Sequence, residues 1–458
     1  MTLYDISALK DKLPEQSVLR AQKNTIQTIV LAGGSPILNE HTVHNGVGAM
    51  VRQGEYVGFA SAPVSSQAEV ESLLQNAEAN AHFMQGKSGR NGRAGTARKT
   101  ICYQTPLEER RISQQHLMSF VQALDRRIAE RYPGLGGRMI SLRADSMEKH
   151  ILTDDGTDAH ILIPRCYLGI SVSVQASDGQ MVDYSQSIGG GFFDEYFSDP
   201  ALLDEATETV VAKAHEKAGG VYSRAGVCDV VLANSVTGIL AHEAIGHTTE
   251  ADMVISGSVA GPNLGHVVAS PLISLTDFAF EAFGSRVPLP VFADDEGTAA
   301  TDAVVIRDGV LTGYMNDLRS AERFHMQPTG NARAFLFSDE PLIRMRNTCI
   351  HPGTSRLEDM IAAVDDGYLL LKNGSGQADG TGEFMFGIQF GYEIKGGKLG
   401  RAIRDTTISG LAFEMLKAVD MVSDELDWSG AGNCGKKQMM PVSHGGPAIK
   451  TRLSIGGR

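Results

Sequence analysis

Alternation of apolar and polar residues along the first half of the chain predicts strands joined by tight turns. Residues 43–61 alternate on both sides of the turn at residues 53–55, Gln-Gly-Glu, and this pattern predicts a hairpin. Further segments of this kind are residues 139–145, 150–154 and 160–176. The first half therefore contributes strands that pair with their neighbours in sequence.

Three segments of the same half have helical spacing of apolar residues, namely residues 67–84, 116–131 and about 200–217. The third begins favourably, because Asp199 can cap the helix and Pro200 takes its first position. Residues 86–98 are rich in Gly and Arg and predict an exposed loop. We place the main domain boundary at Gly219-Gly220, and the alternative is an ordinary connection inside one larger domain.

The second half opens with the apolar run 229–233, which predicts a short buried strand. Asn234 and Ser235 follow as candidate caps of a helix. Residues 287–293 contain two prolines and form an edge strand at best. Further strands are predicted over residues 303–307, 311–315, 368–371 and 384–394, and one more helix over about 408–422.

Length and composition extend this pattern to a fold class. A chain of 458 residues exceeds what one hydrophobic core usually organises, and its 51 glycines favour many turns. We therefore predict an α+β protein of two domains, strand-rich with antiparallel sheets and packed helices. Residues 1–219 are predicted to be an N-terminal α/β domain that faces substrate or partner, and residues 220–458 a strand-rich C-terminal domain that carries the chemistry.

Charge, hydropathy and cysteine usage argue against a nucleic-acid-binding, membrane-spanning or secreted protein. With 41 basic and 54 acidic residues the net charge is −13, which argues against direct nucleic-acid binding. No run approaches the roughly 18 apolar residues of a membrane span, and the first residues lack the apolar core of a secretory signal. An odd, scattered set of cysteines fits a reducing cytoplasm. The cysteines are Cys102, Cys166, Cys228, Cys349 and Cys434.

The run HEAIGH at residues 242–247 is the strongest candidate for chemistry. A neutral imidazole is a good zinc ligand, and a neighbouring carboxylate can take a proton from water that the metal activates. In the common HExxH motif the two histidines lie four apart, rotated by only about 40° on a helix. Here His242 and His247 lie five apart, which is about 140° of ideal rotation.

Both histidines can therefore reach one ion only if the helix is under-wound into a π-bulge or ends before His247. Gly246 stands where such a distortion is expected, and π-bulges are frequent at functional sites. The alternative is a pair of core or capping histidines on an Ala-rich helix. The preceding buried strand, the small residues of the segment and the two acids that follow, Glu250 and Asp252, favour a metal site.

The segment 242–252 resembles the signature of the TldD/PmbA (TldD/TldE) family, whose catalytic members have His-Glu-x-x-x-His followed by Glu-Ala-Asp. The likeness extends over most of the chain in the order of the family. The other matching runs are 294–298 (DDEGT), 313–317 (GYMND), 328–333 (PTGNAR), 344–348 (RMRNT) and 432–436 (GNCGK). Together these runs are specific, although any one alone is not.

The resemblance implies that His242, His247 and Cys434 bind zinc and that Glu243 is the general base of a metallopeptidase. It also implies cleavage of unfolded or flexible peptides, and a dimer formed with another copy or with a TldE/PmbA-like chain. Two imidazoles and a thiolate are a sensible donor set that leaves a fourth position open. Cys434 is expected in a Gly-rich loop, where the nearby Lys436 and Lys437 would favour its thiolate.

Several other residues are weaker candidates. The three carboxylates of residues 294–296 are expected in a solvated turn, with a structural or substrate-facing role. Asn331 and Arg333 lie in a predicted turn near the cleft and are candidate substrate contacts. His444 is a third such candidate, and, like His266, it is more simply explained as a surface histidine.

Two competing functions remain at this stage. A non-catalytic regulatory or binding subunit of the TldE/PmbA type would lack the ligands, whereas this chain has all four candidate residues. A purely structural zinc site usually takes four protein ligands, and the sequence offers three.

A peptide substrate held in extended form beside a strand edge would be bound with little sequence selectivity.

Overall fold

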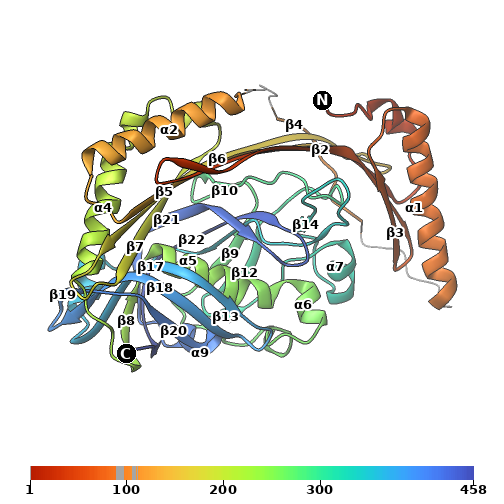
Figure 1. Ribbon diagram of the computed structural model, residues 1–458. Coiled ribbons are helices and arrows are strands. Elements are labelled where there is room, and N and C mark those ends of the chain that lie inside the picture. The colour runs from red at the N-terminus through yellow and green to blue at the C-terminus, as the bar shows by residue number, and fades with distance from the viewer. Residues whose placement is uncertain (1, 89–96, 106–109, 111, 458) are drawn as a thin grey trace.

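The computed structural model describes residues 2–88, 97–105, 110 and 112–457 (Figure 1). A long curved sheet arches over the remainder of the chain, with helices at both ends of the arch. A second, larger sheet and several short helices lie beneath it. Strands and separate helices in this arrangement, with mostly antiparallel pairing, confirm the predicted α+β class.

The arch is a seven-stranded sheet with the order β3-β2-β1-β5-β6-β4 and β7 beside β6. Its pairs are antiparallel apart from β4 with β6. The strands are β1 Ser17–Ala32, β2 Ser35–Gln53, β3 Tyr56–Ala62, β4 Cys102–Gln104, β5 Gly137–Thr153, β6 Asp158–Gln175 and β7 Met181–Gly190. The predicted turn at residues 53–55 separates β2 from β3.

Two sequence predictions for the arch were incomplete. The segments 139–145 and 150–154 are one strand, β5, because its polar middle pairs with β1 on one side and β6 on the other. β1 itself was not predicted, since its polar residues Arg20, Gln22 and Asn24 are buried and break the alternation. These side chains are bonded to backbone carbonyls of residues 335–339 in the second part of the chain.

The outer face of the arch is covered by helices at its two ends. α1 packs on β2 and β3 at one end, while α2 and α4 share an apolar core with β1, β5 and β6 at the other. The helices are η1 Ser7–Lys12, α1 Gln67–Ser88, α2 Gln114–Arg131, α3 Phe193–Tyr196, η2 Pro200–Leu203 and α4 Asp204–Ala218. Asp199 accepts a hydrogen bond from the Ala201 amide, which confirms the predicted cap. Of the loop predicted over residues 86–98, residues 89–96 lie outside the described residues.

The second sheet has eleven strands in the order β13-β12-β9-β16-β22-β20-β18-β17-β8, with β19 beside β18 and β21 beside β22. They are β8 Gly226–Leu232, β9 Leu275–Phe278, β12 Ala303–Arg307, β13 Val310–Leu311, β16 Asn347–Ile350, β17 Asp366–Ala378, β18 Glu383–Lys395, β19 Lys398–Ile403, β20 Thr406–Leu411, β21 Met421–Cys434 and β22 Met440–Ile455. The strands of the arch all precede residue 191 and those of this sheet all follow residue 225. Division into domains at residues 219 and 220 stays a prediction.

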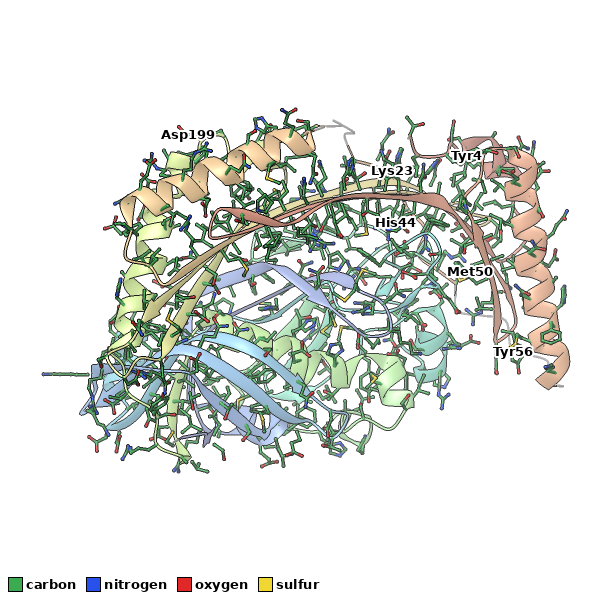
Figure 2. All side chains as sticks on the ribbon, in the orientation of Figure 1. Tyr4, Lys23, His44, Met50, Tyr56 and Asp199 are labelled. Atoms are coloured by element: carbon green, nitrogen blue, oxygen red, sulfur yellow. The ribbon has the colours of Figure 1, made fainter. Side chains whose placement is uncertain are left out.

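Short elements fill the space around the second sheet. The helices are α5 Asn234–Leu240, η3 Ala241–Gly246, η4 His247–Thr249, α6 Ala251–Ile255, η5 Gly261–Asn263, α7 Leu318–Phe324, α8 Leu357–Ala362 and α9 Ala412–Lys417. Two small hairpins pair β10 Glu281–Ala282 with β11 Ser285–Arg286, and β14 Ala332–Arg333 with β15 Leu342–Ile343. Side chains of both parts fill the space under the arch (Figure 2). No helix among the described residues is long and apolar enough to span a bilayer.

Two predictions for the second part were wrong. The helix expected over 408–422 is only six residues long, because Ile408 and Ser409 pair with β18 and β22 as part of β20. The strand expected over 311–315 shrinks to the two-residue β13. Residues 287–293, expected to be an edge strand at best, form no strand in the part of the chain described, because the prolines at 288 and 290 cannot donate to a ladder.

Candidate metal centre

The helix that begins at Asn234 changes its winding at the motif. α5 is an ordinary α-helix, residues Ala241–Gly246 form a π-helical turn, and His247–Thr249 form a 3₁₀ turn. A π-turn closes its hydrogen bonds over five residues, and the His247 amide bonds to the His242 carbonyl accordingly. The five-residue spacing therefore returns both histidines to one face, which is the first of the two geometries expected from the sequence.

Gly246 is required by the close packing at this turn. A Cβ there would lie 2.1 Å from Sδ of Met345 and 3.2 Å from the Ala241 carbonyl oxygen. Met345 is buried next to β16, so its side chain has little room to move away. The glycine thus serves the approach of the turn to the segment 344–346 as well as the change in winding.

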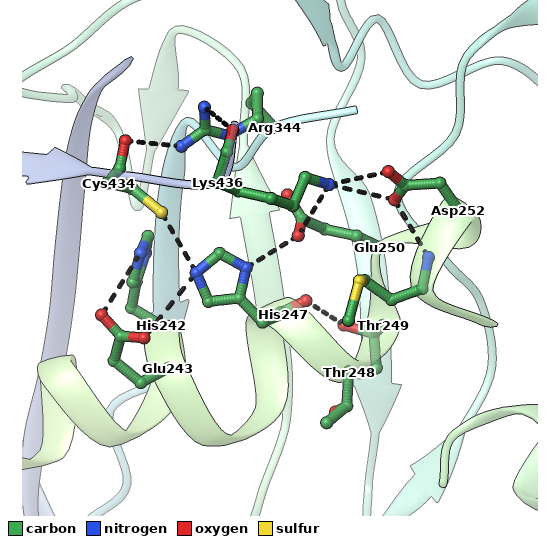
Figure 3. Close-up of polar contacts among 12 residues, drawn as sticks. His242, Glu243, His247, Thr248, Thr249, Glu250, Asp252, Arg344, Cys434 and Lys436 are labelled. Atoms are coloured by element: carbon green, nitrogen blue, oxygen red, sulfur yellow. Dashed lines mark hydrogen bonds and ion pairs between the residues drawn. The ribbon is translucent and has the colours of Figure 1, made fainter. Parts of the chain in front are cut away.

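Three potential ligands converge at the turn (Figure 3). One ligand atom each from His242, His247 and Cys434 can be chosen so that all lie within 4.8 Å of one another. Sγ of Cys434 lies 3.1 Å from Nε2 of His247, although 187 positions separate the two residues. Cys434 is the last residue of β21, so the loop predicted for it was wrong.

Glu243 lies beside the same atoms. Its carboxylate oxygens are 3.7 Å from Nε2 of His247 and 4.0 Å from Nε2 of His242. Its side chain is 25% exposed, whereas the His242 side chain is 2% exposed. Burial raises the pKa of Glu243 above the ordinary glutamate value. Solvent or a substrate can therefore reach the Glu243 carboxylate and, at 19% exposure, the His247 ring.

Glu250 orients His247 from the opposite side of its ring. Oε2 of Glu250 is 2.7 Å from Nδ1 of His247, and the carboxylate is fully buried. Lys436, two residues after Cys434, pairs with Glu250 at 3.1 Å and with Asp252 at 2.9 Å. A proton held on Nδ1 by this carboxylate leaves the Nε2 lone pair facing Cys434 and Glu243. The sequence marked Glu250 as a nearby acid but did not reveal this role.

The charges of the cluster suit metal binding. Burial would lower the pKa of His247, but Glu250 and the hydrogen bond with Cys434 raise it to about 10. Burial would raise the pKa of Cys434, and the hydrogen bond and charge of His247 lower it overall. Burial and the neighbouring His247 keep the pKa of His242 well below its ordinary value. A neutral imidazole and a favoured thiolate are the forms that bind zinc, and binding would release the proton of His247.

The donor set fits a tetrahedral zinc ion with one open position. Ligand atoms of such an ion are separated by about 3.3–3.6 Å, given Zn–N near 2.0–2.1 Å and Zn–S near 2.3 Å. Sγ of Cys434 and Nε2 of His247 lie slightly closer than this, at 3.1 Å, and all three ligand atoms lie within 4.8 Å of one another. Nδ1 of His242 is buried with no hydrogen-bond partner among the described residues. Three protein ligands with an adjacent carboxylate are the pattern of a catalytic rather than a structural zinc site.

The three residues that the sequence offered as substrate contacts, Asn331, Arg333 and His444, are all buried. Asn331 is fully buried and donates to Asp277 and to the Arg344 carbonyl, and Arg333 donates to the Met345 carbonyl. Substrate contact by these two residues stays a prediction. His444 is also buried, and its ring centre is 6.2 Å from that of His242, so a surface position was wrong for it. Burial lowers the pKa of His444 to about 4.

The carboxylates of residues 294–296 are buried, which corrects the expectation of a solvated turn. Asp295 lies 2.7 Å from Nζ of Lys149 and 3.2 Å from Arg20, so the turn joins the arch to the second part of the chain. Arg344 is a buried cation that the sequence did not reveal. It donates to the Cys434 carbonyl at 2.7 Å. In the sequence, Arg344 carried a signal only as a member of the family-like run 344–348.

Comparison with known proteins defines the class to which this site belongs. Residues 225–457 match the family profile of the PmbA/TldA metallopeptidase C-terminal domain, and residues 108–219 match that of the central domain. The chain belongs to the TldD/PmbA family and has a metallopeptidase-family role.

Among curated relatives, the chain is 33% identical to the "Metalloprotease TldD homolog" of Haemophilus influenzae over 445 residues, covering 92% of this chain and 89% of the relative. It is 31% identical to the "Zinc metalloprotease TldD homolog" of Saccharolobus solfataricus over 305 residues, covering 66% of this chain and 67% of the relative. The crystal structure of TldE from Thermococcus kodakarensis has the same fold, with a TM-score of 0.75 at 17% identity over 96% of both chains.

Proposed function

We propose that the protein is a zinc-dependent metallopeptidase that hydrolyses peptide bonds in unfolded or flexible peptides. The observation that carries the proposal is the convergence of His242, His247 and Cys434 next to the partly exposed carboxylate of Glu243. The names of the curated relatives, metalloprotease and zinc metalloprotease, support both the reaction class and the metal.

His242, His247 and Cys434 would hold the ion. When bound, zinc supplies a Lewis acid that polarises a carbonyl and makes water nucleophilic near neutral pH. Glu243 acts as general base: it takes the proton of the attacking water and passes it to the leaving amine. Its raised pKa helps both transfers, because a carboxylate with a pKa nearer 7 accepts and returns a proton more evenly.

Glu250 and Lys436 support this arrangement without contacting substrate. Glu250 holds the Nδ1 proton of His247, and Lys436 neutralises the buried carboxylate while joining it to the strand end that carries Cys434. Carboxylate partners of this kind fix the ring and raise the basicity of the ligating nitrogen.

An extended peptide is the substrate form that suits the surroundings of the site. β21 ends at Cys434 and pairs with β22 on one side; its other edge is bridged by Ser355 at Ser423 and carries no strand further along among the described residues. Backbone hydrogen bonds to such an edge would hold a flexible chain with few side-chain requirements.

The competing proposal is a non-catalytic subunit of a TldD/TldE-type complex. Retention of all four site residues, assembled in one place, favours the enzyme. We further propose that the protein acts as a dimer, with a second copy or with a TldE/PmbA-like chain, because its fold is shared with TldE.

The substitution Glu243→Gln tests the mechanism. It removes the base while keeping the volume of the side chain, so cleavage of an unstructured peptide should fall about 10²- to 10⁴-fold while zinc content is unchanged. Glu358→Gln is the matched control, since the Glu358 side chain is 78% exposed on α8. Cleavage by Glu243→Gln at the wild-type rate would exclude the proposed role of Glu243.

A further inference from the structure

The strand end that carries Cys434 is held by a buried guanidinium from the second part of the chain. Arg344 is 0% exposed and donates to three backbone carbonyls, those of Cys434 at 2.7 Å, Lys436 at 3.1 Å and Gln438 at 2.7 Å. All three acceptors lie at or just after the end of β21, where the chain turns back into β22. One planar side chain thus fixes the course of this turn.

A second buried arginine reaches the same segment from the arch. Arg165 of β6 is 4% exposed and donates to the Gly432 carbonyl at 3.3 Å and to Oδ1 of Asn433 at 3.2 Å. Two hydrogen bonds to Asp145 of β5, at 2.8 and 2.9 Å, hold the guanidinium in this direction. The residues directly before Cys434 are therefore held by the first sheet, and those at and after it by Arg344.

These hydrogen bonds hold in place the one ligand, Cys434, that does not come from the helical segment of the two histidines. His242 and His247 share one short helical segment, whereas Cys434 comes from a distant strand end. Strand ends next to turns are among the less stable parts of a fold, and a ligand displaced by about 1 Å binds metal poorly. A guanidinium is suited to the task because its donors form a rigid fork.

We propose that Arg344 and Arg165 are positioning residues for the metal centre, so that the N-terminal sheet is part of the support of Cys434. The inference rests on the proposed zinc site, and it adds that metal retention depends on a contact between the two parts of the chain. Neither arginine is proposed to contact substrate.

Arg346 provides a matched control two positions from Arg344. It is also 0% exposed and donates to backbone carbonyls, those of Thr329, Thr301 and Asp277, and it pairs with the Asp277 carboxylate at 2.8 Å. Among the described residues, no hydrogen-bond partner of the Arg346 side chain lies in the segment 432–438. Loss of either buried arginine should destabilise the fold, but only Arg344 should affect the cysteine ligand.

The test uses the full-length protein loaded with Co²⁺, whose thiolate charge-transfer absorption reports coordination by Cys434. Arg344→Lys, Arg165→Lys and Arg346→Lys are compared with wild type in this absorption, in the rate of metal release to a chelator and in thermal unfolding. We expect release to be about 10- to 100-fold faster with a weakened thiolate band in the first two variants. Arg346→Lys should unfold at lower temperature yet release metal at the wild-type rate.

Each outcome separates the two proposals. Wild-type protein that shows no thiolate band would overturn the zinc site and this inference with it. A normal wild-type band, together with Arg344→Lys and Arg165→Lys variants that release metal no faster than Arg346→Lys, would overturn the positioning role alone. If Arg344→Lys does not fold, the metal-release rates of Arg165→Lys and Asn433→Ala test the positioning role. These two substitutions weaken the contact with the arch and leave Arg344 in place.

Discussion

The metal centre and the carboxylate turn at residues 294–296 both hold ionisable groups in the interior, and they treat the charge in opposite ways. In the turn the protein itself supplies the partners: Asp295 is bonded to Lys149 at 2.7 Å, and Asp294 accepts from the amides of Thr298 and Ala332. In the metal centre, imidazole and thiolate donors point at one another, and Nδ1 of His242 has no partner among the described residues. A cluster whose carboxylates are paired with cations and amides of the protein itself has a structural role. Imidazole and thiolate donors that face one another are instead placed to bind a metal ion.

The pKa values follow the same division. Burial would raise the pKa of Asp295, but Lys149 and Arg20 lower it, so this acid is charged and paired. Burial raises the pKa of Glu296, reinforced by the charges of Asp317 and Asp294, so this acid carries a proton near neutral pH. In the metal centre the lowered pKa of Cys434 depends on His247, which a bound metal ion would replace as the counter-charge.

The largest effect is expected from Asp295→Asn in the carboxylate turn. Removal of the charge leaves Lys149 and Arg20 buried without their counter-ion, and such a loss costs about 3–5 kcal/mol of the free energy of unfolding. Urea unfolding followed by circular dichroism measures it, with the exposed Asp365→Asn as control. Metal affinity of the folded variant should match wild type, and equal unfolding free energies for the two variants would show that the turn is not a structural anchor.

A smaller effect is expected from Glu250→Gln in the metal centre. The amide oxygen can still accept from Nδ1 of His247, but the negative charge that strengthens the imidazole as a ligand is lost. We expect zinc affinity to fall about 10- to 100-fold, which corresponds to about 1.4–2.7 kcal/mol. Competition with a chelator of known affinity gives the value, and unchanged affinity would remove Glu250 from the support of the site.

The smallest effect at pH 5 is expected from Glu296→Gln, because the acid it replaces is neutral in the folded protein and only partly ionised in the unfolded chain. An acid whose pKa is raised by folding binds more protons in the folded state, so it makes stability fall as pH rises above about 4.5, the ordinary glutamate value. Glu296→Gln should lose this part of the slope, so it differs from wild type by only about 1 kcal/mol near pH 5 and becomes the more stable of the two proteins as pH rises to neutral. Unfolding free energies measured between pH 5 and 8 test it, and an identical slope in both proteins would show that Glu296 is ionised.

The sequence predicted those parts of the molecule that are determined locally. The hairpin at residues 53–55, the helices of the first half and the strand Ala303–Arg307 follow from periodicity and turn residues. The spacing of His242 and His247 required a local distortion, and the π-turn is a direct consequence of chain geometry. These features depend on neighbours within a few residues.

What the sequence did not predict depends on contacts between distant segments. β1 was not predicted because its buried polar residues donate to carbonyls some 310 positions away along the chain. The burial of residues 294–296 depends on Lys149 and Arg20 from the arch. Cys434 entered the site through family resemblance alone, since nothing in its local sequence indicates that a strand end will lie 3.1 Å from His247.

The metal content of the purified protein tests the central claim most directly. Prepared without chelators, the wild-type chain should contain about one zinc ion, held by two imidazoles and one thiolate. Cys434→Ser should lose most of the zinc, while Cys349→Ser, which alters a buried cysteine of β16, should retain it. Absence of zinc from the wild-type protein, or equal zinc content in all three proteins, would contradict the account.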